Sequence, residues 1–334
     1  MLRNIILLIL TVFALSSCFK EDDPLPPFPM QTTTIPMGNT YLYQVYFNLV
    51  NNEVVSTNEK NLYDLQFECA GSGWHIRLNT AALMLAGVTN QTDISAVTDT
   101  TGLPWKYDIS NGNPDSTAIG EWLTINDNDT TYTHLVYVLN RGYDHIGNLR
   151  GLRKIIFTHV DTTSFSFEYS DMNGDNYGTF EITKNKLEKY TSFSFDNGGQ
   201  QINLQPQAHS WDLVFTQYTT LLYTDEGQPY RYLVTGVLSN YNDVSMAVDS
   251  SASYANINLE VAKSHTFSIA QDFIGYDWKS VKGDVTSGNF YYNIVPKRTY
   301  LIKNRDGLIF KLRFINFYSD TGDKGYPTFQ YDVL

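Results

Sequence analysis

The sequence predicts an all-β protein, and two features of its residues lead to that class. Tyr, Phe, Thr and Val are abundant, with 24 Tyr and 19 Phe in 334 residues, and these residue types favour strands. Polar and apolar residues also alternate with a period of two, which indicates strands with one face exposed to water. The alternation is clearest in residues 163–169, 191–195 and 310–314. Pairs such as Asn173-Gly174 mark the turns between strands.

Few segments have a helical period. We expect one short helix within residues 261–273 and another within residues 80–88. The length suits about two domains, and a hydrophobic content of 42% is enough for two cores.

A short motif, aromatic-Asp-Leu-X-Phe, occurs twice in the chain. It spans residues 63–67 and again residues 211–215, 148 positions later. Further matches keep the same order, with offsets that grow to 157. Such agreement predicts a duplicated domain. We expect four pairs of residues to occupy equivalent core positions: Phe47 and Phe195, Phe67 and Phe215, Trp122 and Trp278, Phe157 and Phe314.

Because the motif is repeated, we interpret Trp211-Asp212 as a determinant of the fold. In this interpretation Trp211 lies in a core and Asp212 caps a turn. The alternative is an aromatic side chain that stacks on a ligand, with Asp212 as its polar partner.

The N-terminus has the pattern of an exported lipoprotein. Arg3 precedes an apolar run from Ile5 to Leu15, which is too short to span a membrane and indicates a signal peptide over residues 1–17. The sequence Leu15-Ser16-Ser17-Cys18 resembles a bacterial lipobox, in which the Cys18 thiol receives the lipid. Residues 18–36, rich in proline, would form an extended tether. The alternative is an ordinary signal peptide with an incidental cysteine.

The segment that follows the lipobox resembles the surface-export signal of Bacteroidota lipoproteins. The residues that carry this resemblance are Lys20, Glu21, Asp22 and Asp23. The alternative is a solvated part of the tether. The second cysteine, Cys69, has no partner once Cys18 is lipidated, and we expect it to be a small buried residue.

The second half of the chain resembles the HmuY family of Bacteroidota outer-membrane lipoproteins. The resemblance covers residues 186–334 and extends to residues 37–185 only through the internal repeat. We therefore expect two tandem HmuY-like β domains with these bounds. The blocks that carry it are residues 211–215, 232–238, 274–279, 299–303, 307–314 and 325–327.

The resemblance implies a haem-binding protein that delivers haem, or a related porphyrin, to a TonB-dependent receptor at the cell surface. The best-known member binds haem with two histidines on two loops. In the segment that matches the first loop, this chain has His265 and Met246, and we rank His265 first. The segment matching the second loop, residues 284–290, has neither His nor Met. The alternative readings are a surface loop for His265 and core packing for Met246.

No feature of the sequence indicates an enzyme. There is no nucleotide-binding or hydrolase motif, and no two histidines have the spacing of a zinc site among His75, His134, His145, His159, His209 and His265. A formal charge of −12 opposes nucleic-acid binding. A surface adhesin or structural lipoprotein that grips glycan or protein is the alternative function.

Four triplets in the first half resemble the O-glycosylation motif of exported Bacteroidota proteins. Their candidate acceptors are Thr100, Ser116, Thr130 and Thr162. Asp-Thr is also common in turns, so each is equally well a turn residue.

Overall fold

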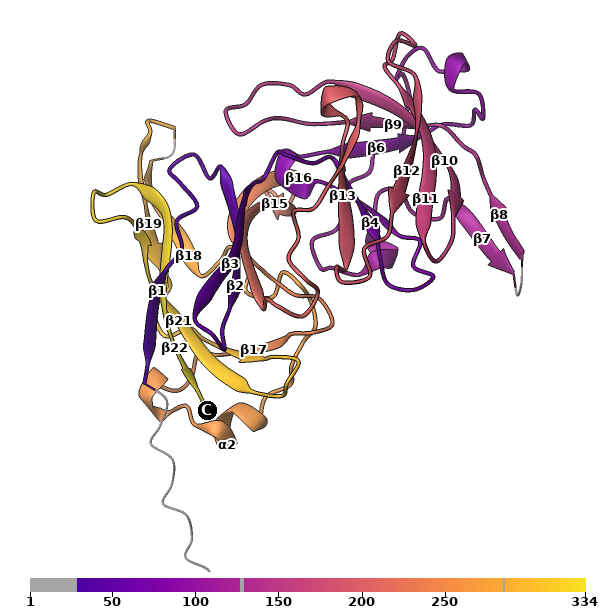
Figure 1. The fold of residues 1–334 in the computed structure, drawn as a ribbon. Helices are drawn as coiled ribbons and strands as arrows, with labels where there is room; N and C mark the ends of the chain where they lie inside the picture. The colour runs from indigo at the N-terminus through magenta and orange to yellow at the C-terminus, as the bar shows by residue number, and fades with distance from the viewer. Residues whose placement is uncertain (1–28, 127–128, 285) are drawn as a thin grey trace, which may run out of the picture.

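A computed structural model of the chain describes residues 29–126, 129–284 and 286–334. Its regular structure is almost entirely β, which confirms the predicted class, and it forms the two lobes seen in Figure 1. The predicted signal peptide, Cys18 and the acidic segment Lys20–Asp23 lie outside the described residues. Residues 31–34, expected at the end of the tether, form a strand instead.

The first lobe consists of residues 62–202 and contains two sheets and a hairpin. One sheet has the order β14-β13-β4-β5, the other has the order β12-β11-β10-β9-β6, and the hairpin is β7-β8. The bounds are β4 Leu65–Glu68, β5 Ile76–Leu78, β6 Leu85–Val88, β7 Leu123–Asn126, β8 Asp129–Tyr132, β9 Tyr137–Asn140, β10 Leu152–Val160, β11 Ser164–Ser170, β12 Gly178–Thr183, β13 Tyr190–Ser194 and β14 Gln200–Ile202.

The second lobe joins the two ends of the described chain. Its sheets have the orders β16-β15-β2-β3 and β1-β22-β21-β20-β17, and its hairpin is β18-β19. The bounds are β1 Gln31–Thr34, β2 Tyr43–Asn48, β3 Glu53–Glu59, β15 Leu213–Tyr223, β16 Pro229–Ser239, β17 Ser245–Asp249, β18 Lys279–Asp284, β19 Asn289–Ile294, β20 Thr299–Lys303, β21 Ile309–Tyr318 and β22 Lys324–Val333.

The helical content is small and lies outside the sheets. The helix expected within residues 80–88 is a single 3-10 turn followed by strand β6, and the one expected within residues 261–273 is confined to α2, Leu259–Lys263. That turn is η1, Thr80–Ala82, and the described residues also contain η2 Ile94–Ala96, η3 Pro114–Ser116, η4 Asp196–Gly198 and η5 Tyr254–Asn256.

The two lobes have the same strand order. Each strand of one lobe has a counterpart in the other whose number differs by eleven, and this holds for both sheets and for the hairpin. The division into lobes does not follow the order of the chain, because β1–β3 belong to the second lobe and β12–β14 belong to the first. The lobes therefore do not follow the expected boundary between residues 185 and 186. Pairing between strands some 160 residues apart, such as β2 with β15, has no signal in the local pattern.

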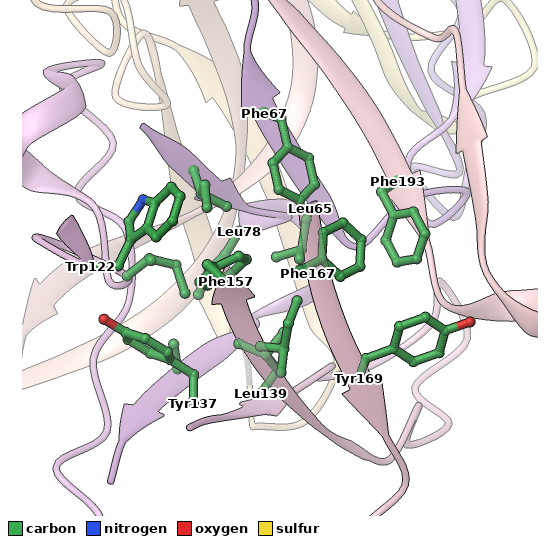
Figure 2. Packing of buried hydrophobic residues seen from close by; sticks show 14 of the residues in the cluster. Leu65, Phe67, Leu78, Trp122, Tyr137, Leu139, Phe157, Phe167, Tyr169 and Phe193 are labelled. Carbon is green, nitrogen blue, oxygen red and sulfur yellow. The ribbon is translucent and has the colours of Figure 1, made fainter. Parts of the chain in front are cut away.

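Aromatic side chains fill the core of the first lobe, as Figure 2 shows. Phe67 on β4 stacks on Phe167 of β11, with ring centroids 5.4 Å apart and an interplanar angle of 6°. At the corresponding place in the second lobe, Phe215 stacks on Phe329 at 5.5 Å and 12°. Both pairs bridge the two sheets of their lobe, and burial of such large apolar side chains is the main stabilising contribution.

The expected core pairs are found in the two cores, with one shift of register. Phe67, Trp122 and Phe157 are buried in the first lobe, and Phe215, Trp278 and Phe314 in the second. Phe47 pairs with Leu213, whereas Leu65 of the first lobe pairs with Phe193. Phe47 therefore corresponds to Phe193 rather than to Phe195.

Each copy of the repeated motif holds three chain segments together through its aspartate. The N–H of Asp212 donates to the carbonyl of Phe47, and its carboxylate accepts from the N–H of Leu49 at 2.8 Å. Asp64 repeats this arrangement in the first lobe, with Phe195 as the donor to its carboxylate at 2.9 Å. The structure thus agrees with a structural role for the motif.

An asparagine completes each junction. Asn240 donates its side-chain amide to the carbonyl of Trp211, and Asn79 does the same to the carbonyl of Tyr63. Both asparagines are fully buried. These amide N–H groups favour one arrangement of the chain, because a buried donor without a partner is costly.

The lobes are in contact through their four-stranded sheets. Thr219 of β15 donates to the carbonyl of Thr80 at 2.7 Å, and the N–H of Gln271 donates to the carbonyl of Asn111 at 2.8 Å. A cavity of about 90 Å³ remains between the lobes.

In the part of the chain that the structure describes, no helix has the length and apolar character of a membrane span.

The two aspartates differ in their charge partners, and this predicts opposite effects of substitution. Arg141 binds Asp64 through two bonds of 2.9 Å, and Arg150 approaches it to 3.0 Å. Asp212 has no basic side chain within 4 Å among the residues that the structure describes. Burial raises the pKa of Asp212 to about 6, against the hydrogen bond from Leu49.

We expect Asp212→Asn to stabilise the protein at pH 8 and Asp64→Asn to destabilise it. The pKa of Asp212 is higher in the folded than in the unfolded state, so its contribution to stability is full below about pH 4 and is lost as the pH rises through 6. The loss amounts to about 3 kcal/mol, and Asp212→Asn removes it. Asp64→Asn leaves the buried Arg141 and Arg150 with the half-exposed Asp196 as their remaining carboxylate partner, at a cost of about 3 kcal/mol. Denaturant unfolding at pH 4 and pH 8 measures both; equal destabilisation at pH 8 would contradict the assignment.

A second prediction follows from the strand pairing. The fragment 62–204 contains every strand of the first lobe and should unfold cooperatively, whereas the fragment 186–334 lacks β1–β3 and should not. Thermal unfolding, monitored by circular dichroism, distinguishes the two fragments. As a control, the fragment 186–334 is extended behind residue 334 by a seven-residue linker and residues 29–60. This extended fragment should unfold cooperatively, because β1 runs antiparallel beside β22. A stably folded 186–334 fragment would refute the pairing.

Candidate functional site

A groove on the outer face of the first lobe is a concave site large enough for a small molecule. Core residues Ile155 and Phe157 of β10 point inward, so the residues that alternate with them, Lys154, Ile156 and Thr158, face outward and form its floor. Its volume is about 620 Å³, within the range of small-molecule and cofactor sites. The walls come from the loop before η2 and from the turn between β8 and β9.

One histidine lines the groove. His134, in the turn between β8 and β9, is exposed and lines the groove. Its ring lies 5.9 Å from the ring of Tyr132, and the ring of His159 lies 5.7 Å from that of Tyr132. The Tyr132 hydroxyl is 3.1 Å from His159 Nδ1. Tyr132 in turn stacks on the buried Trp122 at 5.7 Å, so the core holds this cluster in place.

His134 adopts a left-handed backbone conformation with φ of +50°. A residue other than glycine rarely adopts this conformation without a local reason. The turn is fixed on both sides, because the N–H of Thr133 donates to the carbonyl of Trp122 and the N–H of Val136 to the carbonyl of Gln91.

The floor and far wall of the groove combine apolar and polar groups. Lys154 is buried, and its Nζ donates to the carbonyl of Val97 at 3.0 Å. Tyr177 donates to Glu168 at 3.0 Å. The hydroxyl of Ser170 is buried without a hydrogen-bond partner among the described residues. Ile94 and Ile156 supply apolar surface. An apolar slot with an accessible imidazole and an unpaired polar atom suits a ligand with both apolar and polar parts.

The sequence-predicted ligand His265 lies at the end of α2 and is half-buried. Its Nδ1 donates to the carbonyl of Val261 at 2.9 Å, and its Nε2 is 3.2 Å from the Asp249 carboxylate. The N–H of Ala252 and the neighbouring His265 hold the pKa of Asp249 below its usual range, so Asp249 remains ionised. Both nitrogens of His265 are therefore engaged by the protein.

The other sequence-predicted ligand, Met246, is fully buried in β17, where it pairs with Ile302 in the core of the second lobe. It is inaccessible to a ligand in this structure. In Figure 1, α2 and the β18-β19 hairpin lie at opposite ends of the second lobe. The helix α2, which precedes His265, is thus far from the β18-β19 hairpin.

The remaining candidate residues do not converge on one site. Among the described residues, no group of three His, Cys, Asp or Glu side chains is placed to hold a metal ion. Cys69 is a free, buried thiol 3.1 Å from the Thr191 hydroxyl, and burial raises its pKa. Of the four candidate glycosylation sites, Thr162 is exposed in the turn after β10, and Thr100, Ser116 and Thr130 are half-buried.

The comparison with protein families is decisive for the family of this chain. The model of the HmuY protein family matches residues 40–331, which span both lobes and run from before β2 into β22. The chain belongs to the HmuY family. The sequence resemblance, clear by eye only for residues 186–334, is therefore confirmed over nearly the full length.

The solved structures that match this HmuY-family protein are distant from it. The apo HmuY analog of Tannerella forsythia is 11% identical, with 93% of this chain and 98% of that chain covered and a TM-score of 0.26. Apo PinO from Porphyromonas gingivitis is 8% identical, with 92% and 98% covered and a TM-score of 0.27. An HmuY-like protein of Bacteroides vulgatus, for which heme binding has been suggested, is 10% identical, with 90% of each chain covered and a TM-score of 0.21. The chain has no significant match among curated proteins.

The groove of this HmuY-family protein had no signal in the sequence. His134 and His159 are 25 residues apart and share no motif, and only the pairing of β9 with β10 brings their segments together. Tyr132 and His134 lie two residues apart at the end of a strand, and this spacing by itself does not indicate a ligand site.

Proposed function

We propose that this HmuY-family protein is a non-enzymatic, surface-displayed lipoprotein that binds haem or a related porphyrin and passes it to a TonB-dependent receptor. Membership of the family over residues 40–331 is the observation that carries the proposal. Lipidation of Cys18 and surface export through residues 20–23 belong to the same proposal, on the strength of the sequence alone.

The groove supports haem as the ligand. Haem needs an axial ligand and an apolar slot, and His134 and the isoleucines Ile94 and Ile156 offer both. When bound, haem supplies an iron centre that an imidazole coordinates. His134 would provide that imidazole, while His159, beside Tyr132, is a second imidazole in the same cluster. His265 is the alternative ligand, and its use requires release of the Asp249 carboxylate from Nε2.

A duplication is also part of the proposal. The shared strand order and the matched stacks of Phe67 on Phe167 and of Phe215 on Phe329 support two copies of one unit. In this view one copy consists of β1–β11 and the other of β12–β22. The first three strands of each copy then complete the lobe that the other copy forms. The copy boundary then lies in the loop between β11 and β12, shortly before the expected boundary between residues 185 and 186.

A Soret titration of the purified ectodomain tests haem binding. We expect a shifted, saturable band for the wild-type protein and at least a tenfold weaker affinity with a shifted band for His134→Ala, because the axial ligand is lost. His265→Ala and the control His145→Ala should bind as the wild type does.

The other outcomes are equally informative. If His265→Ala alone weakens binding, the ligand is His265 and the groove is not the haem site. A spectrum identical to that of free haem, without quenching of tryptophan fluorescence, rules out haem binding altogether.

Lipidation is tested by Cys18→Ala. The wild-type protein should incorporate labelled palmitate and fractionate with the outer membrane, and the variant should do neither, since the only proposed acceptor thiol is gone. Replacing Glu21, Asp22 and Asp23 with alanine should reduce digestion by added protease while leaving the lipid label unchanged. A labelled Cys18→Ala protein would contradict the anchoring.

A second function, adhesion to glycan, has one observation in its favour. Three tyrosines of the β15-β16 hairpin and one of β19 are exposed: Tyr223, Tyr230, Tyr232 and Tyr291. Aromatic side chains of this kind offer flat, amphipathic contact surfaces. Tyrosine-dependent retention on immobilised glycans, in a protein that fails the haem titration, would favour this function.

A further inference from the structure

The second lobe has a groove at the position that corresponds to the groove of the first lobe. Phe310 and Leu312 of β21 point into the core, so Lys311 and Arg313 face outward, as Lys154 and Ile156 do on β10. The groove has a volume of about 340 Å³ and lies between the loop before η5, the turn between β19 and β20, and β21.

A shared hydrogen bond confirms that the two grooves occupy the same place in the fold. Lys311 donates to the carbonyl of Ile257 at 3.1 Å, just as Lys154 donates to the carbonyl of Val97 at 3.0 Å. Each carbonyl belongs to the residue directly after a 3-10 turn, η5 or η2. The differences between the grooves are therefore differences of side chains on a common backbone.

The charges of the two grooves are opposite in balance. The groove of the first lobe is lined by Asp93 and Glu168 together with Lys154 and His134. The groove of the second lobe is lined by three cations, Lys297, Arg298 and Arg313, and among the described residues by no Asp or Glu side chain. In a chain of formal charge −12, cations of this groove that lack a carboxylate partner make an anion-attracting site.

Two of the three cations have no carboxylate partner. Arg298 binds Asp277 at 2.9 Å and is neutralised. Arg313 is held instead by a neutral group, because its Nε and Nη2 donate to Gln330 Oε1 at 3.0 and 2.7 Å. Lys297 is exposed and has no carboxylate within 4 Å among the described residues. Lys311, deeper in the sheet, has Asp332 at 3.8 Å.

The geometry orients the charge of Arg313 before any ligand binds. Its guanidinium lies 4.4 Å over the ring of Tyr254, and Gln330 fixes its plane. A fixed guanidinium suits a carboxylate or sulfonate, which it binds with charge-assisted hydrogen bonds. Beside it, Tyr254 and Ile315 provide apolar surface, and Ile315 is 42% exposed.

We propose that this groove binds a small amphipathic anion, with its carboxylate or sulfonate at Lys297 and Arg313 and its apolar or aromatic body against Tyr254 and Ile315. The site is separate from the histidine-bearing groove, so it is independent of the haem proposal.

Calorimetric titration of the haem-free protein with 1-naphthoate and with its methyl ester tests the site. We expect saturable binding of the carboxylate, at least tenfold tighter than that of the ester, and several-fold weaker binding when salt is raised from 50 to 500 mM because the charges are screened. Lys297→Gln and Arg313→Gln should each weaken binding at least tenfold. His134→Gln, in the corresponding groove of the first lobe, should leave it unchanged.

Three results would overturn the proposal: ester and carboxylate that bind equally, variants that bind as the wild type does, or no saturable binding at millimolar naphthoate. Lys297 is exposed and makes no ion pair among the described residues, so Lys297→Gln keeps the test decisive even if Arg313→Gln fails to fold.

Discussion

The fold depends on two long-range strand pairings, β2 with β15 and β13 with β4, and on the buried aspartate that begins the central strand of each pair. Asp212 and Asp64 each accept a backbone N–H from the partner segment and donate their own N–H to it. This arrangement fixes the register, and a slip of one residue would turn the buried phenylalanines toward water. Both cores are therefore closed by segments that are distant in sequence.

The two lobes show how one backbone supports different electrostatics. Asp64 is neutralised by Arg141 and Arg150, whereas Asp212 has only backbone donors and an elevated pKa. The outer grooves diverge in the same way, one with acidic side chains and an imidazole, the other with uncompensated cations. Core positions carry similar side chains in the two lobes, whereas several side chains that line the outer grooves differ. Function is consequently to be sought on the outer faces, where the lobes differ.

The family match and the surroundings of the histidines give different information about this protein. The family match spans both lobes and does not identify a ligand site. The structure gives accessibility: Met246 is enclosed by the core, His265 is engaged on both ring nitrogens, and His134 faces a groove. A ligand needs an accessible donor atom, so accessibility weighs more than position in a matching segment.

The sequence by itself determined the β class, the repeated motif and the core identity of Phe67, Trp122, Phe215 and Trp278, because alternation and local motifs report which residues face inward. It also carried the resemblance to the family, which the full-length match confirms. Only the tertiary structure decided which strands complete which lobe, the correspondence of Phe47 with Phe193, and the joining of Tyr132, His134 and His159. Those features arise from hydrogen bonds between strands up to about 300 residues apart, and no local pattern of residues encodes the choice of such a partner.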